Sequence, residues 1–210
     1  MEVLGLRVGL LSTNCYIVWD EGKQAVVIDP GGHGERIVDE IHKRGLTLVM
    51  VINTHGHVDH IAANTDLMAA TGAKLAIHRF DAPYLSDDKL NLAGNFQLKL
   101  KPLQADLLLE DGQEITVGSM TFQVIHTPGH TPGGICLQVG DALFSGDTLF
   151  AGSIGRTDLP GGDQDQLLQS LREKIVPLPE QLTVYPGHDR STTLAHELRH
   201  NPWLRRSKQQ

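Results

Sequence analysis

The stretch THGHVDH, residues 54–60, constrains this chain more than any other part of it. Three histidines and an aspartate lie within these seven positions, namely His55, His57, Asp59 and His60. Imidazole and carboxylate groups are the usual ligands of borderline and hard divalent metals, and a cluster this dense fits a metal site better than a packing role. The rest of the chain must then supply the missing ligands, which requires a fold that brings distant segments together.

The spacing inside this stretch also restricts its conformation. Residues one or two positions apart point in different directions on a helix, so the four side chains cannot share one helical face. We therefore expect them on an irregular loop that turns alternate side chains inward. Gly56 is expected to relieve crowding between His55 and His57, because glycine has no side chain.

Strands and helices alternate along the rest of the chain. The first 20 residues are expected to form a strand pair. The segment 79–113 has no strong period, and we expect a short helix and a long loop over one face there. Helical spacing of apolar residues predicts helices over 33–45, 58–72, 163–176 and 192–204. Apolar runs predict further strands at 24–30, 46–53, 73–78, 114–118, 120–129, 134–140, 141–147 and 181–188.

Other potential ligands lie where predicted strands finish. His130, Asp147 and His188 each follow an apolar run, and sites form in the crevice beyond the carboxyl ends of strands. Asp29 ends another such run, and it either orients a ligand by accepting a hydrogen bond or caps the turn before Pro30. The ligand-type groups, more numerous than the four of a closed structural zinc site, indicate two metals with open positions: His55, His57, Asp59, His60, His130, Asp147 and His188.

Length and composition restrict the remaining possibilities. A chain of 210 residues can bury a large core, and no repeat or linker divides it, so we expect one domain over residues 1–210. The net charge of −7 and the lack of a basic run argue against a nucleic-acid partner. The first residues show no signal-peptide pattern and no apolar stretch could span a bilayer, so we expect a cytoplasmic protein without membrane contact. Cys15 and Cys136 are expected to be buried free thiols.

Four motifs together resemble the metallo-β-lactamase-fold hydrolases. They are HGHVDH, the histidine of TPGHTPGG, the aspartate of FSGDTLF and the histidine of YPGHD, in the order and wide spacing of that family. The resemblance implies an α/β fold, a four-layer αββα sandwich. It also implies a ligand set: His55, His57 and His130 for the first metal, Asp59, His60 and His188 for the second, and Asp147 as the bridge.

The chemistry that this resemblance implies is metal-dependent hydrolysis. Two divalent ions, expected to be Zn²⁺ with iron or manganese as alternatives, would share a hydroxide that attacks a carbonyl. Asp59 is expected to be both a ligand and the group that orients the hydroxide or accepts its proton, because a carboxylate beside two cations stays ionised. No serine or cysteine nucleophile is needed in such a reaction.

Within the superfamily, the chain looks most like the small stand-alone type II glyoxalases. The segments GDTLFAGSIGRTDLPGGD and YPGHDRSTTLAHELRHNPWL carry this resemblance. It implies a thioesterase acting on S-(2-hydroxyacyl)glutathione or a similar small-molecule thioester or ester. Arg156, in GRTD, either binds a substrate carboxylate or locks its loop through Asp158 or Asp163.

Three other functions remain open from the sequence. A persulfide dioxygenase shares the fold and a GRTD-like segment, and would hold one iron through His55, His130 and Asp147. A metal-dependent lactonase or phosphodiesterase is the second, although the acidic charge argues against long RNA as a substrate. A non-catalytic metal-binding scaffold is the third, although the motifs keep every expected ligand. The oligomeric state does not follow from these residues.

Overall fold

A computed structural model describes residues 1–207, and residues 208–210 of the expected domain lie outside the described part. The first half of the chain forms a six-stranded sheet in the order β1-β2-β3-β4-β5-β6. Its first three strands pair in antiparallel fashion, and β3 to β6 pair in parallel. The strands are β1 (Glu2–Val8), β2 (Thr13–Trp19), β3 (Gln24–Ile28), β4 (Thr47–Asn53), β5 (Lys74–His78) and β6 (Leu107–Leu109).

The second half forms another six-stranded sheet, in the order β14-β13-β10-β9-β8-β7. Within the described part of the chain, its β10–β13 pair is parallel and its other pairs are antiparallel. The strands are β7 (Glu114–Val117), β8 (Met120–His126), β9 (Ile135–Val139), β10 (Ala142–Gly146), β13 (Thr183–Pro186) and β14 (Thr192–Thr193). A two-stranded ribbon, β11 (Leu149–Phe150) with β12 (Ser153–Ile154), follows β10.

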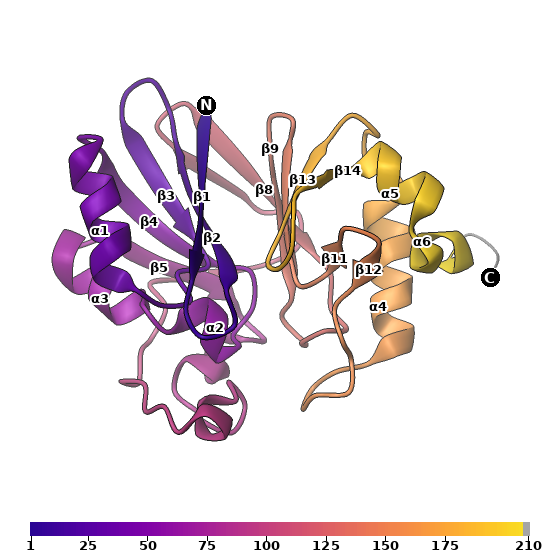
Figure 1. The fold of residues 1–210 in the computed structure, drawn as a ribbon, viewed down its shortest axis with the longest axis horizontal. Coiled ribbons are helices and arrows are strands. Elements are labelled where there is room, and N and C mark those ends of the chain that lie inside the picture. Colours follow the sequence, from indigo (N-terminus) through magenta and orange to yellow (C-terminus); the bar gives the residue numbers. More distant parts are fainter. Residues whose placement is uncertain (208–210) are drawn as a thin grey trace.

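Helices cover the outer faces of both sheets, so the molecule has four layers (Figure 1). On the first sheet lie α1 (Gly34–Lys43) and α3 (Asn64–Thr71), and α2 (Val58–Ile61) follows β4. On the second lie α4 (Gln164–Ser170), its π-helical continuation η3 (Leu171–Ile175), α5 (Leu194–His200) and α6 (Pro202–Ser207). The expected αββα sandwich is therefore confirmed. None of the described helices is long and apolar enough to cross a membrane.

Three hydrophobic clusters correspond to the three interfaces between layers. The middle cluster joins the two sheets, with Val26 and Ile52 from the first facing Phe122 and Phe144 from the second. An outer cluster packs the other face of the first sheet against α1 and α3, and another packs the second sheet against α4, α5 and α6. Both cysteines are buried free thiols, as expected. Alternate side chains of a strand thus point to opposite faces of its sheet and pack into different cores, which fixes the register of each strand.

The predicted helix over 58–72 is interrupted. A continuous helix needs the carbonyl of His60 to accept from the amide of Asn64, but the side chain of Asn53 donates to that carbonyl at 3.1 Å. The amide of Ala63 donates instead to the carbonyl of Pro30, at 2.8 Å. The chain therefore makes one turn, α2, and restarts as α3. The expectation that all four ligands of the motif occupy a loop was wrong for Asp59 and His60, which lie on α2.

Two other predictions needed correction. The closing helix over 192–204 divides at Asn201, whose extended backbone is typical of a residue before proline. The segment 79–113 holds two 3-10 turns, η1 (Ala82–Leu85) and η2 (Ala93–Phe96), and the short edge strand β6, which the sequence pattern did not reveal. The η2 segment lies over one side of the cleft described below.

Candidate metal centre

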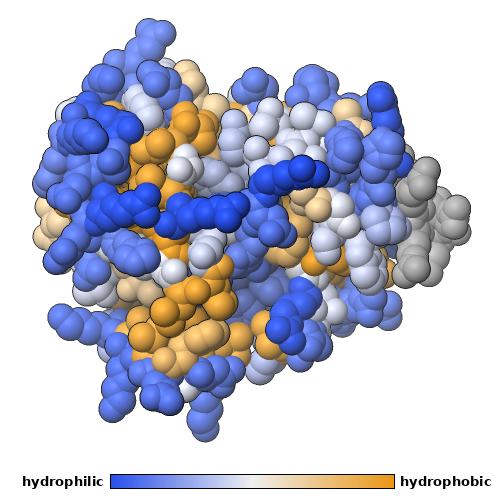
Figure 2. Space-filling view, viewed as in Figure 1, coloured by the Kyte–Doolittle hydropathy of each residue, from blue (hydrophilic) through white to orange (hydrophobic). Residues whose placement is uncertain are grey.

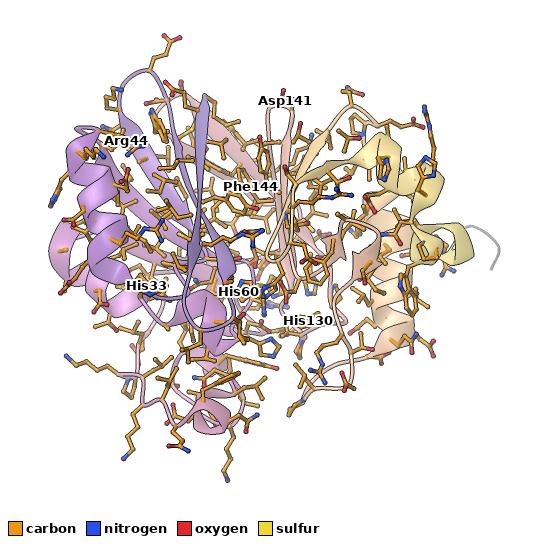
Figure 3. All side chains as sticks on the ribbon, viewed as in Figure 1. His33, Arg44, His60, His130, Asp141 and Phe144 are labelled. Atoms are coloured by element: carbon orange, nitrogen blue, oxygen red, sulfur yellow. The ribbon has the colours of Figure 1, made fainter. Side chains whose placement is uncertain are left out.

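The seven expected ligand residues lie together at one edge of the sandwich. In Figure 3, His60 and His130 extend from elements of the two opposed sheets toward the same region. The possible ligand atoms form three overlapping groups, and within each group they lie within 4.8 Å of one another. The groups are His55 with His57 and His130, His55 with His60 and Asp147, and Asp59 with His60 and His188.

This convergence follows from the strand directions. His55 and His57 lie in the turn between β4 and α2, while His130, Asp147 and His188 follow β8, β10 and β13. The strands β8, β10 and β13 point their carboxyl ends toward one edge, as β10 runs parallel to β13 and as β8 and β10 are both antiparallel to β9. The end of β4 meets them there, since His55 and His57 lie beside His130.

The two sheets approach each other closely at this edge. Gly146, with φ of 48°, ends β10 in the left-handed region, and a Cβ there would lie 2.3 Å from the Thr54 Oγ1. Glycine at this position therefore lets Asp147 reach the ligands that follow β4. Gly56 has a different role from the one expected, because a Cβ on it would strike the side chain of Tyr84 at 2.3 Å rather than a ligand histidine.

Hydrogen bonds at Nδ1 orient three of the rings so that Nε2 faces the other expected ligands. The Nδ1 of His60 lies 3.0 Å from Asp29 Oδ2, and that of His130 lies 2.7 Å from the Arg156 carbonyl oxygen. The Nδ1 of His55 lies 3.3 Å from Thr54 Oγ1, whose proton goes to Asp29. Each of these oxygens can accept an Nδ1 proton, which leaves an Nε2 lone pair when the ring is neutral.

Asp29 is the residue that joins these contacts. Its Oδ2 accepts from the Thr54 hydroxyl at 2.6 Å and faces His60, and its Oδ1 accepts from the Thr54 amide at 2.7 Å. Of its two expected roles, this geometry matches that of an acceptor that orients a ligand. Asp29 is buried and has a φ of 52°.

Several polar atoms of the expected ligands have no hydrogen-bond partner, and these atoms show whether metal ions would fit the site. Within the described residues, His55 Nε2, His60 Nε2 and Asp147 Oδ1 are buried without hydrogen-bond partners. A buried polar atom without a partner costs about 1–3 kcal/mol. His57 Nε2 is likewise buried without a hydrogen-bond partner, and the Nδ1 of the same ring faces His130 Nε2 at 2.9 Å. Cations held by these nitrogen and oxygen donors would satisfy them, and the donor types suit zinc, iron or manganese.

Burial keeps two of the histidines neutral. It lowers the pKa of His57 to about 3, with the neighbouring His130 as a further cause. It also lowers the pKa of His55 well below 6.5, and the charges of His60 and His130 add to this shift. Neutral imidazoles are the form that binds metals, so both rings are available as ligands at physiological pH.

His60 and Asp59 behave differently because carboxylates and imidazoles face each other. Burial opposes protonation of His60, but Asp59, Asp147 and Asp29 outweigh it and raise its pKa to about 10. Burial likewise opposes ionisation of Asp59, yet His60, His188 and Thr13 hold its pKa well below its usual value. Asp59 is therefore ionised, and a cation binding to His60 must displace a proton.

Sequence reasoning missed a buried carboxylate beside the centre, Asp81. Its Oδ2 accepts from the Gly56 amide at 2.9 Å and the Thr131 hydroxyl at 2.7 Å, and its Oδ1 accepts from the Gly133 amide at 2.6 Å. These bonds tie the turn that carries His55 and His57 to the loop after His130. Asp81 lies in the weakly patterned segment 79–113, so no sequence signal indicated it.

A cleft of about 420 Å³ opens in front of the ligands. Its polar lining includes Arg156, Asn95, Ser153 and Asp189. The side chain of Arg156 is 63% exposed, and its Nε and Nη2 each donate to Asp158 at 2.7 Å. Of the two partners considered for locking the loop, Asp158 makes this ion pair, whereas Asp163 caps α4 by accepting from the Gln166 amide.

Known proteins are similar to this chain in sequence along nearly its whole length. The profile of the Metallo-beta-lactamase superfamily matches residues 8–188. The chain is 38% identical to the probable metallo-hydrolase YqgX of Bacillus subtilis, with 95% of each chain covered. It is 34% identical to the hydroxyacylglutathione hydrolase GloC of Haemophilus influenzae, with 97% of this chain and 98% of that one covered.

Solved structures share the fold. The BLEG-1 B3 metallo-beta-lactamase has a TM-score of 0.93 at 38% identity, covering 97% of this chain and 99% of that one. TTHA1623 in a di-iron-bound form has a TM-score of 0.86 at 36% identity, covering 96% and 100%. ETHE1 from Myxococcus xanthus has a TM-score of 0.82 at 35% identity, covering 96% and 84%. The chain therefore belongs to the metallo-beta-lactamase superfamily.

Proposed function

We propose that this metallo-hydrolase is a thioesterase with two metal ions, acting on S-(2-hydroxyacyl)glutathione or a similar thioester. The observation that carries the proposal is the arrangement of seven donors in overlapping groups beside an open cleft. His55, His57 and His130 would hold one ion, Asp59, His60 and His188 the other, and Asp147 would lie between them. We expect zinc at both positions.

Divalent cations would polarise the substrate carbonyl and lower the pKa of water toward neutrality. The chain's own residues bind the substrate, orient the attacking water and move its proton. Asp59 Oδ2 accepts from the Thr13 hydroxyl at 2.8 Å, which fixes its position, and its low pKa keeps it ionised at neutral pH. An ionised Asp59 can orient the attacking water by accepting its hydrogen bond, and we assign to it the proton that this water loses.

Arg156 is the residue that we assign to the thiol carrier. Two of its guanidinium nitrogens bind Asp158, and Nη1 is the remaining nitrogen. A carboxylate is the group that Arg binds best, and glutathione carries two. The hydroxyacylglutathione hydrolase from Haemophilus influenzae, which covers nearly the same length, supports this substrate class.

The test combines metal content with hydrolysis. We expect about two metal ions per chain in protein purified without added metal, and hydrolysis of S-lactoylglutathione. His57→Ala and Asp59→Ala should each lower kcat/KM by at least about 100-fold, since each removes a ligand and Asp59 also accepts a proton. His42→Ala and Asp39→Ala, both on the exposed face of α1, are the matched controls.

A second candidate is an iron-dependent persulfide dioxygenase, which the ETHE1 structure at 35% identity favours. That enzyme type would need one iron, held by His55, His130 and Asp147. One iron per chain, oxygen uptake with glutathione persulfide and no thioester hydrolysis would replace the thioesterase proposal with this one.

A further inference from the structure

A second, apolar pocket of about 280 Å³ opens next to the metal centre. Figure 2 shows hydrophobic residues gathered on this face, where the β1–β2 turn, α2 and the η2 segment meet. The apolar lining residues are Leu10, Leu11, Val58, Ala62, Phe96 and Leu98. The sequence does not indicate that this pocket adjoins the expected ligands, because two of its walls, residues 9–11 and 96–98, lie more than 80 positions apart.

The pocket is continuous with the cleft in front of the ligands. Leu11, Val58, Asp59 and Phe96 line both spaces. Asp59 is a proposed ligand, so the pocket begins where a substrate carbonyl would lie. A group bonded directly to the carbonyl carbon can therefore enter it.

The chemistry of the two spaces differs. Among the residues that the structure describes, the apolar pocket contains one titratable side chain besides Asp59 at its mouth. It is His33, whose Nδ1 accepts from the Gly9 amide at 3.0 Å. The cleft instead contains Arg156 and several polar side chains. A charged thiol carrier fits the cleft, since burying its carboxylates among leucines would be costly. The acyl side of the thioester fits the pocket.

The walls are built to leave apolar surface uncovered. Leu10 and Leu11, at the tip of the β1–β2 turn, are 71% and 46% exposed. Left-handed residues stand at the ends of both walls, Gly9 and Ser12 around the leucines and Leu92 and Gln97 around η2. A ligand that covers these two adjacent, exposed leucines would remove apolar surface from water, which contributes favourably to the free energy of binding.

We propose that the physiological substrate carries an aliphatic acyl chain longer than lactoyl, which occupies this pocket while the thiol carrier lies in the cleft. A cavity of about 150 Å³ lined by apolar side chains can hold benzene, so 280 Å³ suffices for a chain of roughly six to eight carbons. The inference rests on the proposed thioesterase function and narrows its substrate class.

Two series of measurements test it. In the first, the holoenzyme hydrolyses glutathione thioesters of acetate, butanoate, hexanoate, octanoate and decanoate. We expect kcat/KM to rise about threefold per added methylene up to six to eight carbons and then to stop rising. In the second, calorimetry measures binding of the free carboxylates of the same lengths, which requires no turnover. Affinity should rise over the same range.

Substitutions in the pocket test whether it determines the preference for acyl-chain length. Ala62→Leu fills the pocket and should move the optimum to shorter chains, which is seen as a lower ratio of octanoyl to acetyl kcat/KM. Ala70→Leu, exposed on α3, is the matched control and should leave the ratio unchanged. If Ala62→Leu fails to fold, Leu98→Ala carries the test, because it enlarges the pocket and should favour longer chains.

The outcomes separate the two proposals. A flat chain-length profile in an active thioesterase overturns the acyl pocket and leaves the thioesterase intact. Absence of hydrolysis at every length overturns the thioesterase, and the carboxylate series then decides the pocket alone. Affinity that does not depend on length would overturn the pocket. A dimer in sedimentation that Leu10→Asp dissociates would also overturn it, because a second copy of the chain would then cover these leucines.

Discussion

At the scale of single residues, Asp29 shows how much of the site lies outside the ligands. Its φ of 52° is unusual for a residue other than glycine, and it places both carboxylate oxygens against Thr54 and His60. The buried site holds this conformation because three donors meet the same carboxylate.

Asp29→Asn should therefore weaken metal binding while leaving every ligand in place. An amide nitrogen cannot accept from His60 Nδ1 or Thr54, so the ring loses its fixed orientation. We expect the affinity for zinc to fall about 10–100-fold, measured by competition with a chelator. Asp39→Asn, exposed on α1, is the control. Affinity within twofold of the wild type would show that Asp29 does not orient the ligand.

Residue-level prediction from sequence depended on local pattern. The candidate ligands that the structure brings together could be selected from sequence because HGHVDH is dense and the others stand at the ends of apolar runs. Thr13, Thr54 and Asp81 were not, since a lone threonine or aspartate has many ordinary roles. Their contacts, such as the 2.8 Å bond from Thr13 to Asp59, join residues far apart in sequence.

At the scale of elements, Asp81 connects a 3-10 turn to two loops of the centre. Asparagine has the same shape as Asp81, but its NH₂ group is a donor. In place of one carboxylate oxygen, this group would face at least one of the three donors from which Asp81 accepts hydrogen bonds. We expect Asp81→Asn to lower the free energy of unfolding by about 2–3 kcal/mol, measured by urea denaturation. Asp88→Asn, an exposed residue nearby, should change it little. Equal stability of both variants would argue against this role.

Asp20 joins two turns that belong to different sheets. Its Oδ1 accepts from the Gln24 amide at 2.9 Å, and its Oδ2 accepts from the Ser119 amide at 2.8 Å. The Ser119 and Gln24 amides lower the pKa of Asp20 below its usual 3.8. Its contribution to stability is therefore present above pH 3.8 and is lost as the pH falls through the lower folded-state value.

We expect Asp20→Asn to melt below the wild type at pH 7, with the difference in melting temperature shrinking between pH 4 and pH 2.5. A set of calorimetric melts across this range measures it. A difference that stays constant down to the lowest pH would mean that the carboxylate charge has no part in joining the turns.

Element prediction succeeded where one pattern dominated. The strands of both sheets follow apolar runs such as VVI and LVMVI, and α4 begins at the capping residue Asp163. It failed where tertiary contacts decided. The interruption after α2 depends on contacts with Asn53 and with Pro30, both on other elements of the fold, and β6 is three residues long within a segment of mixed polarity.

At the scale of the whole molecule, the three hydrophobic cores do not depend on the metal centre. The middle core, between the two sheets, contains Phe122 and Phe144 and none of the proposed ligands. We therefore expect the protein to remain folded when its metals are removed, unlike a small domain that needs zinc to fold.

Chelation should nevertheless lower stability. Ligand binding stabilises the folded state by about 4 kcal/mol when free metal is 1,000 times its dissociation constant. We expect the far-ultraviolet circular dichroism of the chelated protein to match that of the loaded protein, with a lower melting temperature that recovers on adding zinc. Loss of the spectrum at room temperature after chelation would show that the metals are needed for folding.

The distribution of the donors between the two sheets also sets an order of events during synthesis. His55, His57, Asp59 and His60 leave the ribosome first, together with a sheet whose inner face, including Val26 and Ile52, has nothing to pack against. The covering strands and the last donor, His188, are translated more than 120 residues after His60. The growing chain must therefore keep an uncovered apolar surface and an incomplete set of metal-binding groups in a crowded cell until its second half emerges.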